Sequence, residues 1–354
     1  MITLLAFSAA KILGISAIAS VVAFLWAPFL INFLYKHKLW KKHARTKAIT
    51  GEDATVFNQL HQERETKVPR MGGMLIWVTT VLIIFLFYLL SLLFPQSIFS
   101  DLNFFSRSQT WLPLFTLIVA SLLGLLDDVL VVSSLGGYIG GGLSFKKRLL
   151  IVALMGLLGG IWFYHNLGWD SISIPLLGQF SIGIWYVPLF IIVMIACWSG
   201  GIIDGLDGLS GGAFASIFGA FTIISVAQGK IDLATFCAVI TGTLFAFLWF
   251  NIPPARFYMS EVGSLGLTTT LSVVAFLTDS VIVLPIIAGL LVIEVVSVIV
   301  QILSKKIRHK KIFLSTPIHH HFEALGWPAY KVTMRFWIIG IILAIMGVVV
   351  KLLG

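Results

Sequence analysis

The sequence predicts an all-α polytopic membrane protein with about ten transmembrane helices, and composition and apolar runs predict this class. Of its 354 residues, 58% are hydrophobic and only 11% are charged, and the mean hydropathy is +1.02. A soluble domain carries roughly 25% charged residues. Long apolar runs recur along the whole chain, which indicates helical spans and not the alternating segments of a β-barrel. Residues 1–354 are therefore expected to form a single integral membrane domain.

Ten apolar segments approach the length of about 20 residues that a helix needs to cross a bilayer. They cover about residues 8–34, 72–94, 112–126, 149–167, 184–203, 209–227, 233–250, 264–278, 280–303 and 334–353. The first segment is too long and too apolar for a cleaved signal peptide, so it is predicted to be a span. A re-entrant pairing of 264–278 with 280–303 would give nine spans.

Basic residues give the orientation of the predicted bundle. Most of the 24 Lys and Arg residues fall in alternate connections, on one side of the membrane. The positive-inside rule makes that side cytoplasmic, so both termini are expected to face outward. Short alternation around Gly178, in residues 171–182, predicts a small β-hairpin on the outer side.

The net charge of +9 excludes some functions and leaves others. Most of the Lys and Arg residues are expected to set the membrane orientation and to attract anionic lipids. A subset of them could bind an anionic substrate. No basic groove with interleaved aromatic residues is evident, so a nucleic-acid partner is not expected. Cys197 and Cys237 lie in apolar runs and predict neither a disulfide framework nor a zinc site.

Five acidic residues lie at the predicted cytoplasmic ends of spans. Asp127 and Asp128 end the third span, Asp204 and Asp207 end the fifth, and Glu261 follows the seventh. Such acids are costly to bury unless they are paired or bind a metal. Adjacent carboxylates repel each other, so a cation is expected beside Asp127 and Asp128. Hard oxygen ligands favour Mg²⁺, with Mn²⁺ as a substitute.

Structural interpretations of the same acids stay open. An Asp pair at a helix end is often solvated. Asp-Gly dipeptides in residues 204–208 are typical of a turn, and Asp207 is placed to cap a helix beginning near Leu209. Glu294 lies inside the ninth span, where an acid usually serves helix packing, although an intramembrane acid is also a functional-site hypothesis.

Three consecutive histidines, His319, His320 and His321, lie in a basic loop on the same predicted side. Imidazole donates hydrogen bonds in both its charged and its neutral form near neutral pH. The triplet is therefore suited to phosphate, although any single histidine could be a hydrogen-bonded structural residue.

Four sequence blocks, in this order, resemble the polyprenyl-phosphate N-acetylhexosamine-1-phosphate transferases. They are Asp127-Asp128, Asp204-Gly205-Leu206-Asp207-Gly208, the segment from Asn251 to Leu265, and Pro317-Ile318-His319-His320-His321-Phe322-Glu323. The histidine block, the most specific of the four, is most similar to the phospho-N-acetylmuramoyl-pentapeptide transferases. The resemblance covers about residues 60–350.

The resemblance implies a reaction and a location. It implies ten spans in the bacterial inner membrane, Mg²⁺ dependence, a cleft open to the cytoplasm and a homodimer. Phospho-MurNAc-pentapeptide would pass from UDP-MurNAc-pentapeptide to undecaprenyl phosphate. The products would be lipid I and UMP, in the first membrane step of peptidoglycan synthesis.

The resemblance also implies residue roles. Glu261, with Asp127 or Asp128, would hold Mg²⁺, and one of the two Asp residues would be the base or, in a rival route, a covalent nucleophile. The three histidines would hold the diphosphate. Substrate would further contact Asp204, Asp207, Asn251, Tyr258, Lys67 and Arg70. Asp204 and Asp207 would accept hydrogen bonds from the uracil or ribose. Tyr258 would stack on the substrate or anchor the protein at the membrane interface. Lys67 and Arg70 would contact phosphate.

Some positions depart from the family pattern and indicate a divergent member. Val68-Pro69-Arg70 is closer to GlcNAc-1-phosphate transferases, Gly201 replaces a usual Asn, and Glu261 replaces a usual Asp. A transferase for UDP-GlcNAc or another UDP-HexNAc is therefore an alternative. A transporter or non-catalytic lipid-binding protein is an alternative of another class, although the inverted repeats typical of transporters are not evident.

Overall fold

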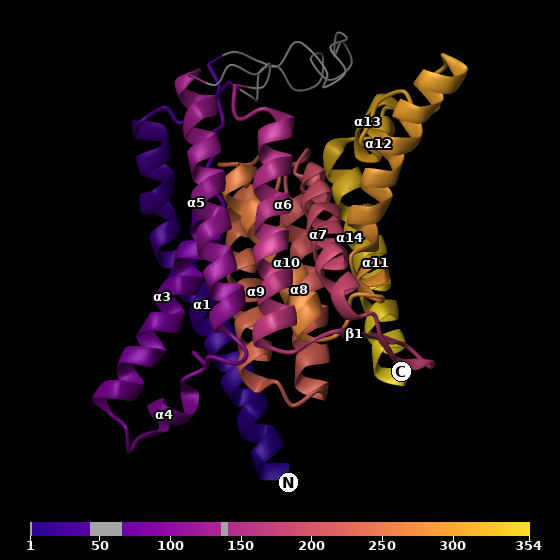
Figure 1. The fold of residues 1–354 in the computed structure, drawn as a ribbon. Coiled ribbons are helices and arrows are strands. Elements are labelled where there is room, and N and C mark those ends of the chain that lie inside the picture. The colour runs from indigo at the N-terminus through magenta and orange to yellow at the C-terminus, as the bar shows by residue number, and fades with distance from the viewer. Residues whose placement is uncertain (1, 43–65, 136–140) are drawn as a thin grey trace.

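The computed structural model describes residues 2–42, 66–135 and 141–354, which form a helical bundle with one small sheet (Figure 1). The helices are α1 (Ile2–Lys36), α3 (Met74–Leu93), α4 (Ile98–Leu102), α5 (Trp111–Ser133), α6 (Phe145–Ile161), α7 (Tyr186–Ser199), α8 (Leu209–Ala227), α9 (Ile231–Asn251), α10 (Ser260–Leu277), α11 (Leu284–Ile287), α12 (Gly289–Arg308), α13 (Ile318–Ala324) and α14 (Ala329–Leu353). Within these ranges, nine helices are long and apolar enough to cross a membrane. The predicted polytopic all-α class is confirmed.

Three helices, α8, α9 and α10, form the middle of the bundle (Figure 1). The most enclosed is α10, because 94% of its residues are buried inside the protein. Most of the remaining long helices expose apolar side chains on their outer faces, as expected for surfaces that meet lipid.

The predicted tenth span differs from the other nine. Residues 280–303 become the short α11 and the longer α12, which returns the chain toward the end where α10 begins (Figure 1). Because α12 buries polar side chains and ends in Lys305, Lys306 and Arg308, it is more polar than the other spans. Since α10 is a full helix, the re-entrant pairing of 264–278 with 280–303 is wrong. Nine described helices have the length and apolarity of a span, and a tenth crossing by residues 280–303 stays a prediction. Both chain ends lie at the same end of the bundle, as the ten-span prediction requires (Figure 1).

The predicted hairpin is present. Strands β1 (Ser171–Ile174) and β2 (Gly178–Ser181) pair antiparallel, with Ser171 opposite Ser181. The amide of Ser173 donates to Asp279 Oδ1 at 3.0 Å, which joins the hairpin to the loop after α10. The hairpin lies at the end of the bundle that holds both chain termini (Figure 1).

Two helix boundaries differ from the predicted ones and move acids into helices. The predicted third span ends at 126, but α5 continues to Ser133, because the apolar residues 129–132 extend it. Asp127 and Asp128 are therefore inside the helix and not at its end. Glu261 was predicted in the connection before a span, but it lies in the first turn of α10. An acid is favoured there by the positive end of the helix dipole.

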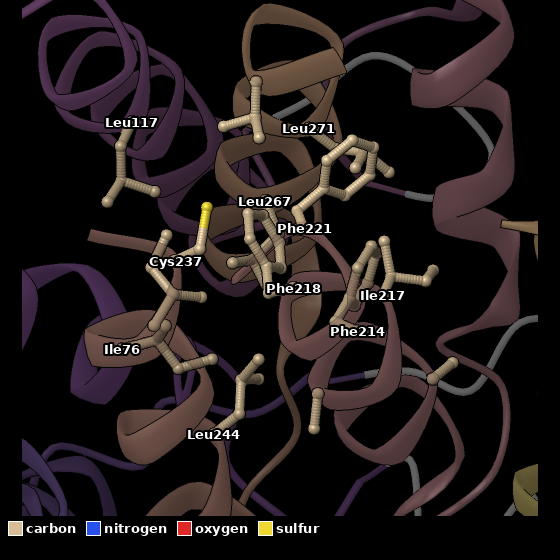
Figure 2. Close-up of a cluster of buried hydrophobic side chains, with 14 of the residues drawn as sticks. Ile76, Leu117, Phe214, Ile217, Phe218, Phe221, Cys237, Leu244, Leu267 and Leu271 are labelled. Atoms are coloured by element: carbon tan, nitrogen blue, oxygen red, sulfur yellow. The ribbon is translucent and has the colours of Figure 1, made fainter. Parts of the chain in front are cut away.

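Small residues let α5 and α10 approach closely. Between helices in lipid there is little hydrophobic driving force, so association depends on close packing and hydrogen bonds. A Cβ at Gly124 would overlap the backbone of Glu261 and Val262, and one at Gly266 would overlap Ser121. Deeper in the bundle, apolar side chains from α3, α5, α8, α9 and α10 fill the interior, among them Leu117, Phe218 and Leu267 (Figure 2).

Gly124→Ala should destabilise the protein by about 1–3 kcal/mol, because the added methyl has no space against the α10 backbone. The thermal midpoint in detergent measures the change. Gly219→Ala in α8 is the matched control, since nothing lies within 4 Å of a Cβ there, and it should leave the midpoint unchanged or raise it. Equal midpoints for the two variants would contradict the close-packing account.

Candidate active site

Asp128 is a fully buried carboxylate whose two oxygens both have partners. Its Oδ1 accepts a hydrogen bond from Arg70 Nε at 3.0 Å, and Arg70 Nη2 lies 2.9 Å away. Its Oδ2 accepts from Ser260 Oγ at 2.7 Å and from the Val262 amide at 3.0 Å. Burial alone would lower the pKa of Arg70, but Asp128 and neighbouring acids raise it above its ordinary value. The two groups therefore form a buried, charged pair that orders the loop before α3 against α10.

Asp127 has a different set of contacts. Its Oδ1 accepts from the Leu143 amide at 2.6 Å, and its Oδ2 lies 2.9 Å from Arg148 Nη2 without hydrogen-bond geometry. Arg148 Nη1 also donates to Glu261 Oε1, so one guanidinium bridges Asp127 and Glu261. Each carboxylate of the Asp pair thus has an arginine beside it, and the expected Mg²⁺ stays a prediction.

Arg148 is the site residue that the sequence analysis missed. It closes the basic run of residues 146–148 at the start of α6, and such runs ordinarily reflect topology alone. A small pocket beside it is lined by Asp127, Leu143, Arg148, Trp198, Glu261 and neighbouring apolar residues. The signal available in the sequence was a cation close to the Asp pair in a stretch otherwise rich in glycine and apolar residues.

Ser260 joins two of the acidic clusters. Its hydroxyl donates to Asp128 and accepts from the Met71 amide at 2.8 Å, while its own amide donates to Asp204 Oδ2 at 2.8 Å. Ser260 has a φ of 52°, a left-handed conformation that favours glycine. Burial raises the pKa of Asp204, opposed by hydrogen bonds from Ser210 Oγ and the Ser260 amide. Asp204 and Asp128 therefore belong to one polar network.

Asp207 and Asn251 hold loops in place. The Ala255 amide donates to Asp207 Oδ2 at 3.1 Å. Asn251 Oδ1 accepts from the Gly208 amide at 2.9 Å, and its Nδ2 donates to the Phe257 carbonyl at 2.8 Å. These bonds join the loop before α8 to the loop between α9 and α10, so the turn interpretation of residues 204–208 holds alongside any binding role.

The remaining predicted contacts lie around this network. Tyr258 is half-buried, and its backbone pairs with Pro69 and Gly72, which places its segment beside the loop that carries Arg70. Lys67 is exposed at the edge of the same loop.

The three histidines do not act as one group. His319 and His320 are buried against the acidic loop, where a Cβ at Gly205 would meet the Nε2 atoms of both rings. His321 instead accepts a hydrogen bond at Nδ1 from the Leu314 amide at 3.1 Å and packs against Phe313. The structure thus brings two of the three imidazoles to the acidic loop and uses the third to brace the preceding loop.

Arg70→Gln should lower stability by about 3–5 kcal/mol, because it leaves the Asp128 charge buried without its partner. Thermal or denaturant unfolding in detergent measures the loss. Adding Asp128→Asn to Arg70→Gln should recover part of it, as a coupled pair requires. The control is Arg256→Gln, an exposed arginine that should stay within about 0.5 kcal/mol of the parent. Additive effects of the two pair substitutions would rule out the coupling.

Comparison with known proteins identifies the family of the chain. The model of glycosyl transferase family 4 matches residues 110–279, which contain all five acids of the predicted clusters. A phospho-N-acetylmuramoyl-pentapeptide-transferase of Anoxybacillus flavithermus is 31% identical over 342 residues, covering 96% of this chain and 98% of the relative. That of Oceanobacillus iheyensis is 36% identical over 304 residues, covering 83% and 86%. That of Rickettsia bellii is 31% identical over 347 residues, covering 92% and 88%. With relatives this similar over nearly its whole length, the chain belongs to the phospho-N-acetylmuramoyl-pentapeptide-transferase family.

Proposed function

We propose that the protein transfers phospho-MurNAc-pentapeptide from UDP-MurNAc-pentapeptide to undecaprenyl phosphate, giving lipid I and UMP. The observation that carries the proposal is the paired cluster of Asp127, Asp128 and Glu261 with Arg70 and Arg148, within a chain of this family. The cluster faces the end of the bundle opposite the chain termini, and the distribution of basic residues assigns that end to the cytoplasm. The enzyme would then work at the inner face of the bacterial cytoplasmic membrane.

Charge neutralisation is the main task of such a site. Both substrates are anionic phosphates that repel each other until cations are placed between them. Arg148 is available for this because it is partly exposed, at 23% for its side chain, and borders the pocket. Arg70 is committed to Asp128 and serves as scaffold. Positioning and electrostatic stabilisation account for most of the rate in phosphoryl transfer.

The residues present fit a divalent cation at one place. Asp128 already accepts from two side chains and one amide, so its oxygens have little capacity left. Asp127 Oδ2 is buried without a hydrogen bond within the described chain, and Glu261 beside it is 24% exposed at the side chain. Among the described residues, no group of three or more His, Cys, Asp or Glu is placed to hold a metal ion. Two carboxylates would leave the other positions around Mg²⁺ to water and substrate phosphates. Glu261 and Asp127 would hold Mg²⁺, or Mn²⁺, which would neutralise charge on the diphosphate.

Asp127 is also the better candidate for proton removal. An oxygen of the lipid phosphate attacks the sugar-bearing phosphorus, the bond to the UMP oxygen breaks, and UMP leaves with the bonding electrons. A proton on the attacking phosphate would pass to Asp127 Oδ2, which is buried 2.9 Å from Arg148 Nη2 and has no hydrogen bond among the described residues. In the covalent route the same atom would be the nucleophile.

Two alternatives make different predictions. The segment Val68-Pro69-Arg70 supports the alternative of a transferase for UDP-GlcNAc or another UDP-HexNAc. Within this segment, Arg70 contacts Asp128. A transporter would gather its acids near the membrane middle. Here the acids meet where α10 begins and α5 approaches its end, which supports the transferase.

Purified protein with undecaprenyl phosphate and Mg²⁺ should release UMP from UDP-MurNAc-pentapeptide and not from UDP-GlcNAc. UMP is measured by chromatography, with lipid I detected in parallel. EDTA should abolish release, and Mg²⁺ or Mn²⁺ should restore it. Release from UDP-GlcNAc alone would favour the alternative sugar, and release from neither, with transport of one of them into vesicles, would favour the transporter.

Asp127→Asn and Glu261→Gln should each reduce kcat by about 100-fold or more, because each removes a charge from the proposed reacting centre. The matched control is Asp232→Asn. Asp232 forms an ion pair with Lys11 at 3.2 Å, in the first turn of α9 at the far end of the bundle, so its loss should leave kcat unchanged. Full activity and an unchanged Mg²⁺ response in both cluster variants would remove the metal-site proposal.

A further inference from the structure

Glu294 is a buried acid that the carboxylate cluster does not use. It lies on α12 with no exposed surface, and its Oε2 is 3.0 Å from Nδ1 of the equally buried His319. Among the described residues, neither group has a partner with hydrogen-bond geometry, so the close approach to each other is the contact that offsets their burial. An acid without such an offset would be costly in a membrane protein.

A second histidine also lies against a carboxylate, in this case with hydrogen-bond geometry. His320 Nδ1 lies 2.7 Å from Glu323 Oε2, and both side chains are at least nine-tenths buried. The two imidazole rings are neighbours, with centroids 4.1 Å apart. Each ring therefore turns its Nδ1 atom toward a carboxylate.

The opposite atoms of the two rings converge. A Cβ placed on Gly205 would meet Nε2 of His319 and, at 3.2 Å, Nε2 of His320. Gly205 lies between Asp204 and Asp207 in the acidic loop. Glycine is thus the residue that lets both Nε2 atoms reach this loop, because any side chain would occupy their place.

We propose that Glu294 and Glu323 are positioning residues that fix the proton of His319 and His320 on Nδ1 and aim both Nε2 atoms at the acidic loop. A carboxylate only accepts hydrogen bonds, so the nitrogen that faces it carries the proton. The Nε2 atom of each ring then faces Gly205 in the acidic loop. Carboxylates that orient histidines in this way are common behind metal-bound and catalytic imidazoles.

The pairing explains why an acid is kept inside α12. Removal of one partner from a buried pair ordinarily lowers stability, because the other partner is left without its contact. Stability alone therefore does not separate a packing role of Glu294 from an orienting one, whereas the tautomer of His319 does.

The first test reads the tautomer directly. Protein labelled with ¹⁵N-histidine is placed in lipid bilayers, and the His319 signals are assigned by their loss in His319→Gln. Nδ1 should carry the proton in the parent and in the conservative variant Glu294→Asp. In Glu294→Met the signal should shift toward an unprotonated Nδ1. An unchanged His319 tautomer in Glu294→Met would overturn the proposal.

The second test rests on the proposed transferase function. Glu294→Met and Glu323→Gln should each lower kcat/KM for UDP-MurNAc-pentapeptide by about 10–100-fold, the usual effect of removing a residue behind a functional histidine. Glu294→Asp should restore most of it, and Asp232→Asn should change neither the spectrum nor the rate. A shifted tautomer with an unchanged rate would overturn the positioning role. If the parent releases no UMP, the transferase function fails, whereas the tautomer measurement still decides the orientation claim.

Discussion

The close approach of α5 to α10 is the constraint on which the candidate site depends. Gly124 faces the backbone of Glu261 one turn before the Asp pair, so the helices are closest where their acids lie. This spacing lets the Val262 amide and Ser260 hydroxyl reach Asp128. A wider separation would leave these acids to be solvated separately. Packing by small residues, the ordinary means of helix association in lipid, therefore also builds the polar network.

Three carboxylates can lie close together in the cluster because two arginines pair with them. Arg70 saturates Asp128 and joins the loop before α3 to the interior, whereas Arg148 is shared between Asp127 and Glu261 and stays partly exposed. One arginine thus pairs with a single carboxylate, whereas the other bridges two and borders the pocket. The same division appears among the histidines, since His321 braces a loop while its two neighbours face Gly205.

Much of this arrangement could be predicted from the sequence, and the failures have physical causes. Apolar runs identified the spans and the hairpin, and acids at span ends identified the clusters. The end of α5 was placed too early because a charge was taken as a boundary, although a paired carboxylate can continue inside a helix. Arg148 was missed because a basic run at a span end has the same appearance whether it serves topology or a site. The separate directions of three adjacent histidines follow from a helical turn, α13, that their sequence alone did not reveal.

The polarity of α12 has a consequence for how the protein is made. A helix that contains Glu294 and Gln301 and ends in a run of cations is poorly suited to enter a bilayer alone. Its buried face is completed by contacts with α13 and α14, which are synthesised afterwards. The contact of Glu294 with His319 therefore forms only after α13 has left the ribosome, and a chain truncated before α13 would leave this acid without it.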